Sequence, residues 1–204
     1  MTDGNPKDLF HWVAQLSVNE KLRMSLSPAK CLGEAAQIRA QADRLLAATR
    51  ELDGGEKGME RGLSALSEVK GMFGPMEGGY RAECGMLAGL ANKELAANFT
   101  LTMPADRLYA EAHFWRSRVL ADMLAASSYY KVAAELISLA MKTLDKCAPS
   151  MKPGEIALLL SHAAALLADA AKFMASAGEE LGDNDVRWKN LEEAVKKLKR
   201  RRGL

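Results

Sequence analysis

The sequence is poor in the residues that build β-sheets. Aromatic residues make up only 6% of the 204 residues, and β-branched residues are sparse, whereas Ala, Leu, Met, Glu and Lys abound. Because the first group favours strands and the second favours helices, the composition predicts an all-α fold with no sheet. Hydrophobic residues at 49% and charged residues at 26% are typical of a globular protein, which excludes a disordered chain.

Cysteine is scarce too. Cys31, Cys84 and Cys147 are odd in number, lie far apart in the chain and form no CxxC motif. This pattern favours buried free thiols in a reducing compartment over a disulfide or a redox role.

Long apolar runs and a large net charge are also missing. The longest uncharged stretch, Ile156 to Ala168, is shorter than the roughly 20 residues that a bilayer span requires. The first residues show neither the basic nor the apolar region of a signal peptide, and the formal net charge is only +2. We therefore expect a cytoplasmic or nuclear protein.

Proline, glycine and capping residues divide the chain into segments with helical apolar spacing. Asn5-Pro6 and Ser27-Pro28 each place a capping side chain before a proline at the first helical position. The pair Gly58/Gly62 is expected to let a neighbouring helix approach closely. Together, the boundaries predict about seven to eight antiparallel helices in one domain, residues 1–204, as a bundle or a helical-hairpin array. Further boundaries are expected at Gly54-Gly55, Gly74-Pro75, Pro104, Cys147–Gly154 and Gly182-Asp183-Asn184, with a candidate bend at Ser127-Ser128.

Motifs that carry chemistry are absent from the sequence. Glu111 and His113 are two residues apart, so their side chains lie on different faces of a helix and cannot form the Glu-x-x-His pair of a di-iron bundle. Neither a Gly-rich phosphate loop nor a Gly-x-Ser-x-Gly elbow occurs. We therefore predict a protein that is not an enzyme and that holds no metal or cofactor.

A pocket inside the bundle is an alternative to that prediction. Such a pocket, of an enzyme or a small-molecule carrier, would lie around four side chains: His113, Trp115, Tyr129 and Tyr130. Against it stands the simpler interpretation that aromatic residues at helical spacing form core.

The C-terminal segment, residues 195–204, is predicted to be a basic tail. It contains six cations in seven residues at the end of an amphipathic helix. The simple interpretation is a solvated terminus whose cations complement the helix dipole. The functional interpretations are a nuclear-import signal, contact with an acidic membrane and contact with nucleic-acid phosphates. The cations are Lys196, Lys197, Lys199, Arg200, Arg201 and Arg202.

Three Ala-rich segments carry a family resemblance. Residues 124–136, with Leu124-Ala-Ala and Tyr129-Tyr130, resemble the Leu-Ala-Ala…Tyr-Tyr helix of the Bro-one domain of Alix and rhophilin. Residues 31–46 and 86–94 are similar to two further helices of that family, in the same order. The β-containing portion of the family is absent, and Gly89 and Asn92 replace its Gln pair. The resemblance implies docking of helical tails from ESCRT-III filament subunits.

These observations favour a non-enzymatic module that binds an amphipathic helix or peptide of a protein partner in a groove between its helices, as an ESCRT-associated adaptor would. Eleven methionines would suit an adaptable groove of this kind. The alternative is a membrane-surface or nucleic-acid-associated protein that acts through the basic tail. The oligomeric state stays open.

Overall fold

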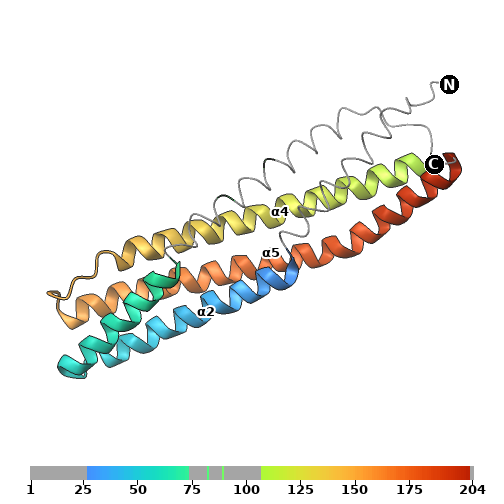
Figure 1. Cartoon of the computed structure of the whole chain (residues 1–204). Helices are drawn as coiled ribbons and strands as arrows, with labels where there is room; N and C mark the ends of the chain where they lie inside the picture. The colour runs from blue at the N-terminus through green and yellow to red at the C-terminus, as the bar shows by residue number, and fades with distance from the viewer. Residues whose placement is uncertain (1–26, 74–81, 83–88, 90–106, 203–204) are drawn as a thin grey trace.

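A computed structural model describes residues 27–73, 82, 89 and 107–202 of the protein. These residues contain no strand, which confirms the all-α prediction. Four helices account for nearly all of them: α2 (Pro28–Glu51), a helix over residues 55–73, α4 (Arg107–Leu144) and α5 (Pro153–Arg202) (Figure 1).

Local signals set the beginnings of these helices. The Ser27 hydroxyl accepts a hydrogen bond from the backbone N–H of Lys30 at 3.1 Å, and Pro28 follows it, as the capping pattern predicts. Gly55 adopts φ +74° in the turn after α2, a conformation that few other residues tolerate. At the start of α5, the Glu155 carboxylate accepts a hydrogen bond from the Lys152 N–H at 3.1 Å.

The longest element is α5, whose 50 residues span about 75 Å at 1.5 Å per residue. A series of buried residues recurs along α5 in alternating steps of four and three, and this heptad pattern is typical of left-handed coiled-coil packing. The repeat runs without interruption from one end of the helix to the other. The positions are Ile156, Leu160, Ala163, Leu167, Ala170, Met174, Ala177, Leu181, Asn184, Trp188, Leu191, Val195 and Leu198.

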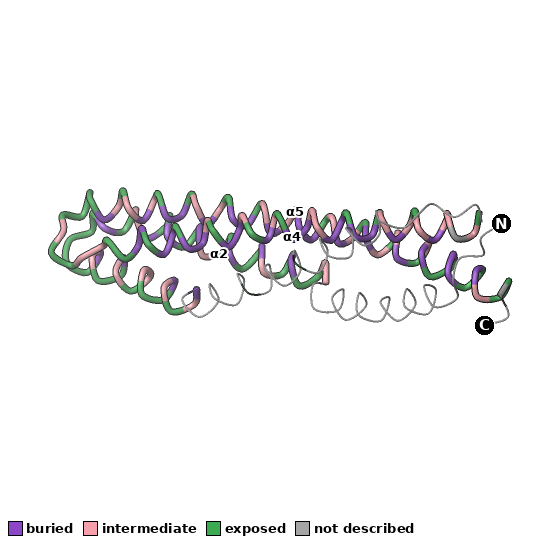
Figure 2. Tube along the Cα trace, turned by 90° about the horizontal axis from the view of Figure 1, so that it is seen from above, coloured by how far each residue is buried: buried purple, intermediate pink, exposed green. Residues whose placement is uncertain are grey.

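The same heptad pattern occurs in α4, which lies antiparallel to α5 along its whole length. Figure 2 shows the buried positions following both helices from end to end. Small residues alternate with large ones, so the two helices interdigitate. The buried heptad positions of α4 are Ala112, Arg116, Val119, Met123, Ala126, Tyr130, Ala133, Ile137, Ala140 and Leu144.

The helix α2 packs on the N-terminal half of α5, and the 55–73 helix turns back along α2 (Figure 1). A Cβ atom at Gly178 of α5 would lie 3.3 Å from the Cys31 Cβ and 3.1 Å from the Leu32 Cγ of α2. A Cβ atom at Gly62 would lie 2.5 Å from the Leu52 Cδ2. The expected close approach at the Gly58/Gly62 pair is therefore confirmed, because the end of α2 occupies the space beside it.

Two predicted boundaries fall inside continuous helices. The helix α4 is continuous through the candidate bend. There the Ser127 and Ser128 hydroxyls donate to the Leu124 carbonyl at 2.8 Å and 3.0 Å. The stop predicted at Gly182-Asp183-Asn184 is wrong, because the Asn184 side-chain amide donates to the Val119 carbonyl of α4 at 2.7 Å instead of capping a new helix. The predicted total of seven to eight helices is not confirmed. The segment between the predicted boundaries Pro6 and Ser27, and all but residues 82 and 89 of the segment between Pro75 and Pro104, lie outside the described residues.

Two glycines of α5 offer a matched test of this packing. Gly178→Val is expected to lower the free energy of unfolding by about 1–3 kcal/mol more than Gly182→Val, because the new methyl groups meet α2 only at Gly178. Both variants make the same change in helix propensity, so that contribution cancels in the comparison. Urea denaturation followed by circular dichroism measures the difference, and equal destabilisation by the two variants would contradict the α2–α5 contact.

Candidate functional site

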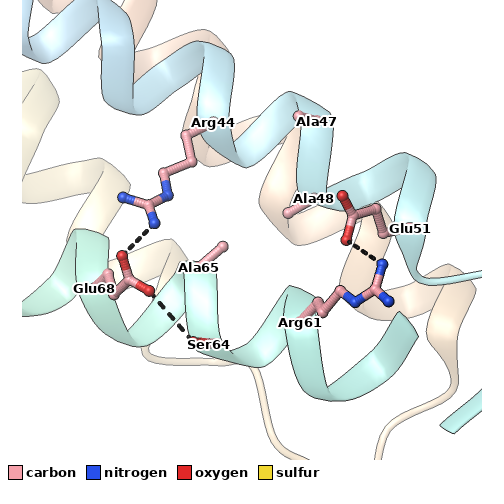
Figure 3. Close-up of a pocket in the computed structure, with 8 residues that line it drawn as sticks. All are labelled: Arg44, Ala47, Ala48, Glu51, Arg61, Ser64, Ala65 and Glu68. Atoms are coloured by element: carbon pink, nitrogen blue, oxygen red, sulfur yellow. Dashed lines mark hydrogen bonds and ion pairs between the residues drawn. The ribbon is translucent and has the colours of Figure 1, made fainter. Parts of the chain in front are cut away.

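A pocket of about 280 Å³ lies between α2 and the 55–73 helix, and we call it the α2 pocket (Figure 3). Ion pairs between the two helices flank it: Arg44 with Glu68, and Arg61 with Glu51 at 3.7 Å. The Ser64 hydroxyl donates to Glu68 at 3.3 Å. The lining residues are Arg44, Ala47, Ala48, Glu51, Arg61, Ser64, Ala65 and Glu68.

The chemistry of the α2 pocket suits binding of a side chain. The side chains of Ala47, Ala48 and Ala65 are methyl groups, so an apolar group of a partner can pack against them. The flanking charges are of both signs and their side chains are at least about half exposed, so they can also pair with a bound partner. The residues that line the pocket include no His or Cys.

The four side chains predicted to form a pocket lie apart from the α2 pocket. Tyr130 is fully buried, and its hydroxyl donates to the Glu34 carboxylate at 3.1 Å, which ties α4 to α2. The Tyr129 ring lies 6.3 Å from the Phe173 ring of α5. Trp115 is partly buried against the core, and His113, which follows the first α4 heptad position, Ala112, is half-buried. Their role in binding stays a prediction.

The basic tail is part of α5, because the helix continues through Arg202. Lys196 pairs with Glu193 of the same helix at 3.3 Å, and Lys197 pairs with Glu111 of α4 at 3.2 Å. The remaining described cations differ in exposure: Lys199 is half-buried, whereas Arg200 and Arg201 are exposed. The side chain of Arg202 lies outside the described residues.

A buried polar cluster between α4 and α5 was not predicted from the sequence. Asp122 of α4 is only 6% exposed and forms an ion pair with Arg187 of α5, which also lies 4.0 Å from Asp183. Its second oxygen, Oδ2, finds no hydrogen-bond partner within the described part of the chain. Burial raises the pKa of Asp122, and the hydrogen bond and charge of Arg187 oppose that rise. The available signal was Asn184, a polar residue at a heptad core position beside this pair.

Cysteine and metal chemistry are limited in the described residues. Cys31 is buried, and Cys147 is half-buried beside Lys70, with its thiol pKa raised by burial. Over residues 27–73 and 107–202, no group of three or more His, Cys, Asp or Glu side chains could hold a metal ion.

One described helix, α5, is long and apolar enough to cross a membrane by length and composition alone. The core helix of a water-exposed bundle meets the same criteria, and the heptad positions of α5 are buried against its neighbours. The expected location in cytoplasm or nucleus stays a prediction.

Comparison with known protein families, curated proteins and solved structures finds no match to this chain. The resemblance to the Bro-one domain therefore stays a prediction.

The burial of Asp122 predicts a pH dependence of stability. Its pKa in the folded protein is raised above the ordinary value of 3.8, so the folded protein holds the proton more tightly than the unfolded chain does. The free energy of unfolding therefore falls as the pH rises from 3.8 through the folded-state pKa. Asp122→Asn should remove this contribution. The stability of the natural protein minus that of the variant should be largest at acidic pH and level at neutral pH.

Urea denaturation between about pH 3 and about pH 8 measures this difference. Asp169→Asn, which removes an exposed carboxylate of α5, is the control. A stability difference that grows with rising pH would show that the charge and hydrogen bond of Arg187, rather than burial, determine the direction of the pKa shift of Asp122.

Proposed function

We propose that the protein is a non-enzymatic helical interaction module that binds an amphipathic helix or peptide of a partner protein. The α2 pocket carries this proposal, because its alanine methyl groups lie between two ion pairs that link α2 to the 55–73 helix (Figure 3). In this proposal the pocket takes one anchoring apolar side chain, and the flanking charges bind polar side chains on either side of it. An ESCRT-associated adaptor is the finer form that the sequence resemblance suggests.

The size of the α2 pocket supports a side-chain anchor over a small-molecule site. Its volume of about 280 Å³ falls just below the roughly 300–1,000 Å³ typical of ligand pockets. A helical peptide presents such an anchor once per turn, together with charges three or four residues away.

Filling the α2 pocket tests this function. Ala65→Trp should occupy the pocket and weaken binding of an amphipathic peptide at least about tenfold, whereas Ala165→Trp on the exposed face of α5 should leave binding unchanged. The measurement is calorimetric titration with a panel of amphipathic helical peptides that includes ESCRT-III carboxy-terminal tails.

Circular dichroism of both variants controls for folding. Peptide binding that survives Ala65→Trp would exclude the α2 pocket as the site. Failure of every peptide to bind the natural protein would contradict the proposed function itself.

A second candidate function is attachment to an anionic membrane or nucleic acid through the C-terminal end of α5. Its support is the continuous helix, which holds the cations in fixed register on the surface. Lys196 and Arg200 are four residues apart and both exposed, so they share one face. Binding of this kind should weaken steeply as the salt concentration rises.

A further inference from the structure

An exposed aromatic ring lies between two arginines at the start of α4. Arg107, Phe114 and Arg118 are separated by seven and four residues, which places them on one face of the helix. Phe114 is 51% exposed, and the Arg118 guanidinium carbon lies 5.6 Å from the centre of its ring. The ring of Trp115 meets Phe114 edge to face at 5.2 Å. A large apolar ring is thus held in solvent beside cations.

This face of α4 lies next to the basic end of α5. The start of α4 and the end of α5 are side by side at the same end of the bundle (Figures 1 and 2). The Lys197 ammonium contacts the Glu111 carboxylate at 3.2 Å, and Phe114 follows Glu111 by one helical turn. Arg200 in turn follows Lys197 by one turn. We call the combined surface the basic–aromatic face: Arg107, Phe114 and Arg118 of α4 with Lys197 and Arg200 of α5.

We propose that the basic–aromatic face binds the surface of an anionic lipid bilayer, with Phe114 inserted among the headgroups and the cations around it paired with lipid phosphates and carboxylates. This proposal deepens the second candidate function by adding three residues of α4 to the basic tail and by naming the partner. Amphipathic surfaces that combine cations with a protruding aromatic ring are typical of interfacial membrane contacts.

Two features favour a bilayer over nucleic acid. Single-stranded nucleic acid binds to a series of aromatic rings on which successive bases stack, whereas Phe114 is the one exposed aromatic ring in the described part of this face. The exposed cations Arg107, Arg118 and Arg200 also belong to two antiparallel helices that are joined by the Lys197–Glu111 ion pair, so both helices can contact one planar surface.

The experiment is cosedimentation of the full chain with vesicles of phosphatidylcholine alone and with about 30% phosphatidylserine, at low and high salt. The natural protein should sediment only with the anionic vesicles, and less so at high salt. Phe114→Ser should lower the partition coefficient about tenfold or more, since it removes the ring that the proposal inserts into the bilayer surface. Leu158→Ser removes a side chain that is 73% exposed near the other end of α5, and it should have no effect.

Charge reversal tests the cations in the same assay. Arg118→Glu and Arg200→Glu should each lower the partition coefficient at least about fivefold, whereas Lys172→Glu on the mid-portion of α5 should change it far less. Circular dichroism confirms that each variant is folded.

Three results would overturn the inference. Binding that depends on Arg200 but not on Phe114 or Arg118 would leave the basic-tail function standing and exclude the basic–aromatic face. Absence of binding to anionic vesicles would exclude the basic–aromatic face and membrane attachment through the basic tail. Tight binding of an oligonucleotide, measured by fluorescence anisotropy, with no sedimentation on vesicles would assign the cations to nucleic acid. Peptide binding at the α2 pocket is unaffected by any of these outcomes.

Discussion

The heptad seam between α4 and α5 is the contact on which the other described elements depend. It joins a helix of 38 residues to one of 50 through apolar positions that repeat every seven residues. The helix α2 packs on α5, and the 55–73 helix lies along α2. The α2 pocket and the basic–aromatic face therefore both take their geometry from α5, although they lie in different halves of the molecule.

Polar groups lie in the seam near Asn184 and favour a single register of α5 against α4. The Asn184 amide donates to the Val119 carbonyl, and the Asp122 carboxylate pairs with Arg187 a turn away. A shift of α5 by one heptad against α4 would leave both polar groups buried opposite apolar side chains, which costs free energy. Because burial of the Asp122 charge lowers stability somewhat, these polar residues contribute to the choice of register more than to the free energy of unfolding.

Local signals in the sequence predicted much of the fold but not its longest elements. Composition predicted the helices, and Ser27-Pro28 predicted the start of α2, because caps depend on neighbouring residues alone. Asn184 resembles a cap in the sequence, yet its partner Val119 lies 65 residues away, so only the heptad repeat through position 184 could have revealed the continuous helix. The α2 pocket requires two helices to meet and was not predicted. The basic tail was predicted, but its neighbour Phe114 was not.

The continuity of α5 through residues 182–184 is the central claim, and a distance between two spin labels tests it most directly. Labels at Leu158 and Lys189, both exposed, would lie 31 residues apart on one helix, or about 46 Å at 1.5 Å per residue. The native cysteines would first be replaced by serine or alanine. Electron–electron double resonance should then give one narrow distance distribution near that value. A shorter or broad distribution would show that the chain breaks at Gly182-Asp183-Asn184, as its local sequence suggests, and would contradict the account.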